Sequence, residues 1–179
     1  MKPIAIVLNG ASSAGKGTIA RAIQELAGRP VLHVSLDMFT DMFHWPAVSE
    51  NERAACHAVG VANFHAALPL LASGEFPLIV DHVFEQHAWF EACREGLKER
   101  RTYFIGVRCP LAVLEEREKA RGDRRIGLAR FQFERVHEQK TYAMEVDTSA
   151  HSPTENAAAI LRFVEDAEKT IHERGNPSA

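Results

Sequence analysis

An apolar segment near the start of the chain runs directly into small residues and one lysine. Residues 4–8 are all apolar, and the sequence NGASSAGKGT follows at 9–18. A short apolar run that ends at a glycine is typical of a strand buried on both faces. Because small residues follow this strand, another molecule can approach the backbone closely at the junction. No other feature of the chain constrains its fold as strongly.

The glycines and the lysine of this junction have a defined spacing. Gly10, Gly15 and Lys16 fit the pattern G-x-x-x-x-G-K, which forms a phosphate-binding loop between a strand and a helix. Backbone N–H groups then point inward around a phosphate, and the helix N-terminus and the lysine add positive charge. The alternative is a glycine-rich turn with a surface lysine. The residues expected to hold the phosphates are Gly10, Ala11, Ser12, Ser13, Ala14, Gly15, Lys16, Gly17 and Thr18.

Strands and helices are expected to alternate along the rest of the chain. The expected strands are 4–8, 31–35, 78–80, 102–107 and 144–146. The expected helices are 18–27, a short one within 38–52, 53–73, 87–98, 111–120, 128–140 and 154–171. Gly60 and Pro69 are expected to break or shorten the helix at 53–73. This alternation predicts an α/β fold in three layers, with helices on both faces of a five-stranded parallel sheet.

Length and composition indicate a single domain over 1–179. The chain has 46% hydrophobic and 25% charged residues and a net charge of −3, which gives no reason to expect nucleic acid or an anionic membrane as partner. The spacing of Cys56, Cys93 and Cys109 fits neither a disulfide framework nor a metal knuckle, so free thiols in a reducing compartment are expected. The apolar run at 4–8 is too short for a signal peptide or a membrane span. We expect a cytoplasmic protein.

The residue after the lysine departs from the usual pattern. A serine or threonine that ligates magnesium normally follows directly, but Gly17 stands there and Thr18 comes one position later. The form G-K-G-T resembles the loop of adenylate-kinase-like enzymes, in which more of the metal is held through water. Thr18 is therefore a candidate for Mg²⁺ binding, either directly or through water.

Several classes of nucleotide-binding protein are excluded by the sequence. A GTPase needs an Asn-Lys-x-Asp sequence, which is absent, and a large ATPase motor needs a longer chain. A small kinase remains. Its further parts are a carboxylate on the acceptor side, a second carboxylate near magnesium and a mobile basic lid.

Two aspartates stand where expected strands end. Asp37 follows the second strand and can accept the proton of an attacking hydroxyl; alternatively, it caps a helix that begins at Met38. Asp81 follows the third strand and can orient magnesium or its waters, although strand-end acids are also common. His82 beside it is interpreted as structural or pocket-lining, because a single histidine does not make a metal site.

The candidate lid is the segment 117–135, which has seven basic and three acidic residues. Arg117, Arg121 and Arg124 have the spacing of one helix face that can point at phosphates. Gly122 and Gly127 allow such a segment to close over a ligand. The alternatives are a solvated charged helix and a nucleic-acid patch.

Five segments resemble the chloramphenicol phosphotransferase family: LNGASSAGKG, VSLDMFTDMF, IVDHVF, GVRCPLAVLEEREKARGDR and VHEQKTYAMEVDTS. The resemblance implies a P-loop kinase fold and transfer of the γ-phosphoryl group of ATP, with Mg²⁺, to a hydroxyl of an antibiotic. It implies that Asp37 is the catalytic base, that Lys16 and its loop hold the phosphates, and that Arg121 and Arg124 contact ATP. Residues 147–149 would lie near the adenine.

The likeness to the family is weakest at 44–76, where the acceptor would bind. Residues 38–76 contain one basic residue, Arg53, and four acidic ones. Anionic acceptors are normally held by arginines, because the contact is bidentate and strong. The aromatic residues of this region, which either line the acceptor site or pack in the core, are Phe39, Phe43, Trp45 and Phe64. A neutral or cationic acceptor with apolar area is therefore favoured, and chloramphenicol is one candidate.

The sequence thus predicts an ATP-dependent kinase that phosphorylates a hydroxyl on a small, non-anionic molecule. One alternative is a metabolic kinase with an anionic acceptor, which needs arginines from elsewhere in the chain. Another is a non-catalytic nucleotide-binding protein with a regulatory or toxin-like role. The sequence leaves a homo-oligomer open.

Overall fold

A five-stranded parallel sheet forms the centre of the structure, with strand order β2-β3-β1-β4-β5. The computed structural model describes residues 3–122 and 126–175. The strands are β1 (Ile4–Asn9), β2 (Leu32–Ser35), β3 (Leu78–His82), β4 (Arg101–Arg108) and β5 (Met144–Asp147). The helices are α1 (Lys16–Leu26), α2 (Leu36–Thr40), the short 3-10 helix η1 (Trp45–Ala47), α3 (Arg53–Ala72), α4 (His87–Gly96), α5 (Leu111–Arg121), α6 (Leu128–Phe133) and α7 (Pro153–Gly175).

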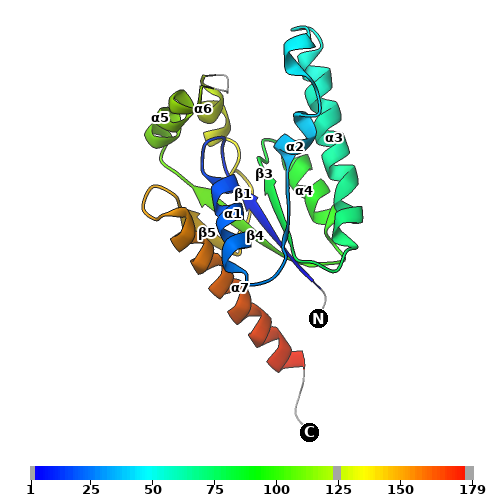
Figure 1. Cartoon of the computed structure of the whole chain (residues 1–179), viewed down its shortest axis with the longest axis vertical. Coiled ribbons are helices and arrows are strands. Elements are labelled where there is room, and N and C mark those ends of the chain that lie inside the picture. Colours follow the sequence, from blue (N-terminus) through cyan, green and yellow to red (C-terminus); the bar gives the residue numbers. More distant parts are fainter. Residues whose placement is uncertain (1–2, 123–125, 176–179) are drawn as a thin grey trace.

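Helices cover both faces of this sheet (Figure 1). Ile6 and Leu8 of β1 pack in the cluster that includes α1 and α7, whereas Ala5 and Val7 pack in the cluster that includes α3 and α4. Because alternate side chains of β1 enter two different cores, the strand is apolar throughout. The predicted α/β fold with a five-stranded parallel sheet in three layers is confirmed.

α3 runs without interruption, so the predicted breaks at Gly60 and Pro69 are wrong. A Cβ on Gly60 would lie 3.0 Å from the Cα of Thr40, which means that this glycine allows α3 to pack closely on α2. Pro69 stands in the last turn of the helix, next to the fully buried Leu68. Tertiary packing outweighs the local preference at both positions.

The helix predicted over 128–140 is also wrong in extent, because α6 ends at Phe133. Carbonyls beyond that point accept hydrogen bonds from side chains: Asn9 Nδ2 donates to Val136 O at 2.6 Å and Lys140 Nζ donates to Glu138 O at 2.8 Å. These contacts replace the hydrogen bonds that would continue the helix.

One arginine fastens the C-terminal end of α3. Arg100 is only 6% exposed. Its guanidinium donates to five backbone carbonyls, those of Ile4, Leu71, Ala72, Gly74 and Phe76. The N-terminal half of α3 rises beyond the sheet (Figure 1). α3 is therefore fixed at its base and extends past the carboxyl ends of the strands.

Among the described residues, α3 is the one helix with the length and composition of a membrane span, at a mean hydropathy of 1.3. Length and composition alone are weak evidence for such a role. Phe64 and Leu68 of α3 are fully buried in the core, which is typical of a helix that packs against a sheet.

Candidate active site

The phosphate-binding sequence forms a loop between β1 and α1. Gly10 lies so close to β4 that a Cβ there would come within 2.5 Å of Val107 O. Gly15 has a φ of 86°, a backbone conformation that side chains disfavour. Ile19 N donates to Gly15 O at 3.0 Å as α1 begins. The two glycines of the motif thus meet two different steric requirements, and the loop stands at a helix N-terminus.

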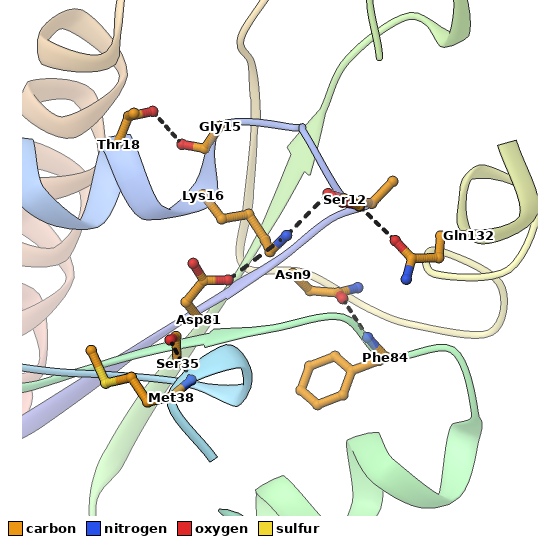
Figure 2. Close-up of polar contacts among 11 residues, drawn as sticks. Asn9, Ser12, Gly15, Lys16, Thr18, Ser35, Met38, Asp81, Phe84 and Gln132 are labelled. Carbon is orange, nitrogen blue, oxygen red and sulfur yellow. Dashed lines mark hydrogen bonds and ion pairs between the residues drawn. The ribbon is translucent and has the colours of Figure 1, made fainter. Parts of the chain in front are cut away.

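Lys16 folds back over the loop toward β3 (Figure 2). Its Nζ donates to Ala11 O at 3.0 Å and lies 3.7 Å from Asp81 Oδ1. The two side chains of this ion pair are 8% and 14% exposed. The lysine charge is therefore held at the carboxyl ends of β1 and β3, beside the loop.

The surroundings of Asp81 suit a magnesium ion that is bound largely by phosphates and water. Gly17 packs against Asp81, since a Cβ there would lie 3.5 Å from Oδ2. The Thr18 hydroxyl donates to Gly15 O at 2.7 Å, away from Asp81 (Figure 2). The described residues contain no group of three or more His, Cys, Asp and Glu side chains that could hold a metal. Mg²⁺ commonly uses only one or two carboxylates together with substrate phosphates and waters.

Asp37 lies in the first turn of α2. Ser35, rather than Asp37, caps this helix, because its Oγ accepts from Met38 N at 3.3 Å. Ser35 is paired with Asp81 in the register of β2 and β3, so α2 begins next to Asp81. Asp37 and Asp81 line the same cavity of about 670 Å³, here called the main cavity.

The main cavity extends from the phosphate loop to α2, η1, α3 and α4. Beyond the loop residues it is lined by acidic and aromatic side chains: Asp37, Asp41, Trp45, His57, Glu85 and Trp89. Basic side chains also line it: Lys16, Arg21 and Arg121. Lys16 and Arg121 belong to the phosphate loop and to α5, whereas Arg21 comes from α1. The sequence analysis did not anticipate Arg21.

The four aromatic residues considered for the acceptor site have different places. Trp45 lines the main cavity, and Phe43 packs beside it with ring centroids 6.0 Å apart. Phe64 is fully buried in the core, and Phe39 meets it edge-on at 5.4 Å. The structure adds Trp89 of α4 to the wall of the cavity.

The basic segment forms α5 and α6. Arg117 Nη2 donates to Thr148 O at 2.8 Å and Nη1 donates to Thr148 Oγ1 at 3.1 Å, which joins α5 to the connection after β5. Arg121 lines the main cavity. α5 ends at Arg121, so this helix carries two of the three arginines predicted to share one face, and Arg124 lies outside the described residues.

A second cavity of about 490 Å³ adjoins the loop on the α5 side. It shares Ser13, Gly15, Thr18 and Arg121 with the main cavity and is also lined by Thr148. The resemblance places the adenine near 147–149, which is where this cavity lies.

Polar contacts that the sequence does not reveal join the loop region to distant segments. Gln132 Oε1 accepts from Ser12 N at 2.6 Å, and Gln132 Nε2 donates to Glu85 Oε1 at 2.7 Å. Asn9 Oδ1 accepts from Phe84 N at 2.9 Å (Figure 2). Asn9 and Glu85 have a sequence signal, because each stands at or just after a strand end, but Gln132 has none.

His82 is the last residue of β3 and follows Asp81 directly. It is fully buried and stacks on Phe84 with centroids 4.2 Å apart. Its Nε2 lies 3.0 Å from His65 Nε2. Burial, followed by the charge of His65, lowers the pKa of His82 well below its usual value. A neutral, buried ring agrees with the structural interpretation of this residue.

Solved structures with this fold include kinases. A gluconokinase from Sinorhizobium meliloti 1021 matches with a TM-score of 0.70 and 20% identity, over 97% of this chain and 98% of its own. The Mycobacterium tuberculosis APS kinase CysC in complex with AMPPNP and APS matches with a TM-score of 0.69 and 15% identity, over 92% and 98%. A tunicamycin resistance protein from Deinococcus radiodurans matches with a TM-score of 0.66 and 20% identity, over 90% and 95%. The fold is that of the P-loop kinases.

The chain belongs to the chloramphenicol phosphotransferase-like protein family, whose profile matches residues 4–165. A provisionally named O-phosphotransferase occurs in two strains of Mycobacterium tuberculosis, CDC 1551 / Oshkosh and H37Rv. Each version is 25% identical over 81% of this chain and 75% of its own length. The family resemblance of the sequence motifs is confirmed, and family and fold together indicate a nucleotide-binding phosphotransferase.

Proposed function

We propose that this protein transfers the γ-phosphoryl group of ATP to a hydroxyl of a small, non-anionic molecule. The observation that carries the proposal is the main cavity, in which Lys16 and the phosphate loop share one space with Asp37. A kinase needs this juxtaposition, because its catalytic power comes mostly from positioning donor and acceptor and from stabilising charge.

The phosphate side of the cavity would hold ATP. The loop N–H groups, the N-terminus of α1 and Lys16 attract the phosphates. Arg121 and, by resemblance, Arg124 meet the charge on the transferred group. Arg117 is bonded to Thr148, so it is suited to shaping the second cavity, where we place the adenine.

Magnesium fits this arrangement through Asp81, whose carboxylate already faces the charge of Lys16 at 3.7 Å. When bound, the ion would neutralise charge on the β- and γ-phosphates. Thr18 remains a candidate, because its hydroxyl oxygen keeps lone pairs for the ion while it donates its proton to Gly15 O. Because Mg²⁺ commonly keeps several waters, we expect Asp81 to act mainly through metal-bound water.

Asp37 would orient the acceptor hydroxyl and take its proton. As the bond between the acceptor oxygen and the γ-phosphorus forms, the bond from that phosphorus to the leaving oxygen of ADP breaks, and the hydroxyl proton passes to the carboxylate. Ser35 already caps α2, so the fold does not need Asp37 for that purpose.

The acceptor side favours a neutral or cationic molecule with apolar area. Three carboxylates, those of Asp37, Asp41 and Glu85, and two indole rings, those of Trp45 and Trp89, line it. Aromatic rings and carboxylates suit such ligands. Chloramphenicol heads the candidates because the family description names it, and inactivation of an antibiotic in the cytoplasm is the role we propose with it.

Arg21 favours a second candidate, a kinase with an anionic acceptor. Its side chain lines the main cavity from α1. It also lies near His33, whose pKa is lowered first by burial and then by the charge of Arg21. A guanidinium there can bind a carboxylate or phosphate of the acceptor.

A transfer screen tests both candidates. Radiolabelled ATP with Mg²⁺ is offered with antibiotics, nucleosides and sugars, and with phosphorylated and carboxylated sugars, followed by mass spectrometry of the products. We expect label on a hydroxyl of a non-anionic compound, and roughly 10²-fold slower labelling with the Asp37→Asn variant. Label on anionic compounds alone, abolished by Arg21→Gln, supports the second candidate. ATP binding without transfer to any compound supports a non-catalytic role.

A further inference from the structure

One glutamine side chain spans the phosphate loop and the acceptor side of the main cavity. Gln132 is 5% exposed and lies in α6, far from both segments in the sequence. Its Oε1 accepts from Ser12 N at 2.6 Å, and its Nε2 donates to Glu85 Oε1 at 2.7 Å. Gln132, Glu85 and Ser12 all line the main cavity. The amide thus connects a backbone N–H of the loop to a carboxylate that faces the acceptor.

These two contacts require an amide group. A carboxamide accepts with its oxygen and donates with its nitrogen at the same time, whereas an ionised carboxylate only accepts and a thioether offers no donor. A glutamate at 132 would keep the bond from Ser12 N but would place a second negative charge against Glu85. Only a neutral amide satisfies both neighbours when Glu85 is ionised.

α6 itself is anchored to α5 by a buried carboxylate. Glu118 is 1% exposed, and its two oxygens accept from Gly127 N and Ala129 N at 2.7 Å each. α5 also carries Arg121, which lines the main cavity. Gln132 therefore links α6, which Glu118 joins to α5, to the phosphate loop on one side and to Glu85 on the other.

We propose that Gln132 is a positioning residue for phosphoryl transfer, which fixes the phosphate loop relative to Glu85 and α6. This inference rests on the proposed function. Gln132 acts by holding Ser12 and Glu85, and it sets the alignment of the γ-phosphoryl group and the acceptor hydroxyl. Misalignment on the ångström scale costs about 10²-fold in rate, while the remaining loop N–H groups and Lys16 retain ATP.

The test compares Gln132→Met with Gln24→Met as its matched control. Gln24 also makes one side-chain amide contact, to Val31 O at 2.9 Å, but it is exposed and does not line the main cavity. We expect Gln132→Met to lower kcat by roughly 10- to 100-fold, with the ATP affinity measured by calorimetry changed less than about threefold. The control should match the wild type. An unchanged kcat in Gln132→Met overturns the proposal.

A paired exchange separates positioning from a general packing role. Gln132→Glu should lower kcat as Gln132→Met does, because two carboxylates then meet. Adding Glu85→Gln reverses the two roles: the new amide can donate to the new carboxylate, which still accepts from Ser12 N. Because Glu85 also lines the acceptor side, Glu85→Gln alone measures its own effect, and we expect the double variant to be at least about fivefold faster than Gln132→Glu. A double variant no faster than Gln132→Glu overturns the proposal, since intact bonding would then not restore the rate.

Hydrogen exchange of the Ser12 amide, followed by NMR on the nucleotide-free full chain, reports on the bond without any acceptor. Loss of one hydrogen bond should speed exchange roughly three- to tenfold in Gln132→Met, with no change in Gln24→Met. If the wild type phosphorylates no compound, the proposed function fails while this measurement still decides whether Gln132 holds the loop. If the wild type is active and exchange is unchanged in Gln132→Met, the positioning role fails alone.

Discussion

The phosphate side of the main cavity comes mostly from one continuous segment, 10–18, whereas the acceptor side is assembled from α2, η1, α3, α4 and the end of β3. The loop is specified mostly by local requirements, such as the positive φ of Gly15, and in addition by the close approach of Gly10 to Val107 O of β4. The acceptor wall depends on side chains such as Trp45 and Trp89, which only the tertiary fold brings together.

Because of this difference, the two sides of the cavity are suited to different ligands. Backbone N–H groups and one lysine bind any phosphate chain of suitable geometry, so the loop provides affinity with little choice among nucleotides. Side chains from separate elements can each change with little effect on the others, so we expect the acceptor side to set selectivity. Substitutions on the two sides should therefore alter different kinetic constants.

The largest effect is expected from Lys16→Met, on the phosphate side. The side chain is 8% exposed, and methionine keeps its apolar stem in place while removing the charge. We expect kcat/KM to fall by roughly 10³-fold and ATP affinity to fall with it, because in the proposed function the ammonium contacts ATP before and during transfer. Calorimetry with ATP and steady-state kinetics measure the two quantities. Unchanged ATP affinity would remove Lys16 from the phosphate site.

Asp37→Asn should affect the rate alone, by about 10² or more. Asparagine keeps the size of the side chain, and Ser35 caps α2 in either case, so the melting temperature should stay within a few degrees. ATP affinity should stay the same, because Asp37 is on the acceptor side. The three measurements are made on one sample. A variant with early melting but normal turnover would give Asp37 a structural role.

Trp45→Leu should change acceptor binding and leave ATP binding intact. The indole lines the cavity, and losing most of its contact area should raise the acceptor KM by about tenfold. The control is Phe76→Leu, since Phe76 is 57% exposed and does not line the cavity. Kinetics at varied acceptor and fixed ATP measure the effect. A rise in the KM for ATP instead would place Trp45 on the nucleotide side.

The smallest effect concerns pH and the support behind the phosphate loop. His137 Nδ1 lies 2.9 Å from the Tyr142 hydroxyl, which accepts from Asn9 Nδ2 at 2.6 Å. Burial, followed by the charge of Arg108, lowers the pKa of His137 from 6.5 to about 4. Between these values the unfolded chain binds a proton that the folded chain does not, so stability falls as the pH drops through this range.

The His137→Asn variant tests this contribution. Its melting temperature should fall less between pH 7 and pH 5 than that of the wild type, by roughly a few degrees. His44→Asn, at an exposed position, should show the wild-type slope. Equal slopes for His137→Asn and the wild type would show that other buried histidines, such as His82, account for the pH dependence.

The sequence predicts what depends on local pattern. The apolar run of β1, the spacing of Gly10, Gly15 and Lys16, and the family motifs lead to the fold and the phosphate loop. Gly60 misleads, because its role is close packing on Thr40 and not helix termination. The periodicity of the sequence could not show that Asn9 Nδ2 donates a hydrogen bond to Val136 O. This contact helps to end α6 at Phe133.

The candidate site is predicted less completely than the fold, because several of its residues are brought together only by tertiary packing. Asp37 and Asp81 stand at strand ends, and the carboxyl ends of parallel strands meet at one edge of the sheet. Gln132 and Arg21 lie inside helices, where nothing in the pattern distinguishes them from solvated residues. Their places in the cavity follow from how α1 and α6 pack on the loop.

Arg100 has a consequence for how this fold can diversify among relatives. Arg100 binds five backbone carbonyls, of which those of Leu71 and Ala72 belong to α3 and the others to β1 and the segment after the helix, so this contact does not depend on which side chains the helix carries. The protruding half of α3 and the preceding segment around η1 can then change in evolution, by substitution or by insertion, with little loss of folding stability. We expect members of this family with different substrates to differ mainly in the protruding half of α3 and the segment around η1. The contacts of Arg100 at the base of the helix should stay the same.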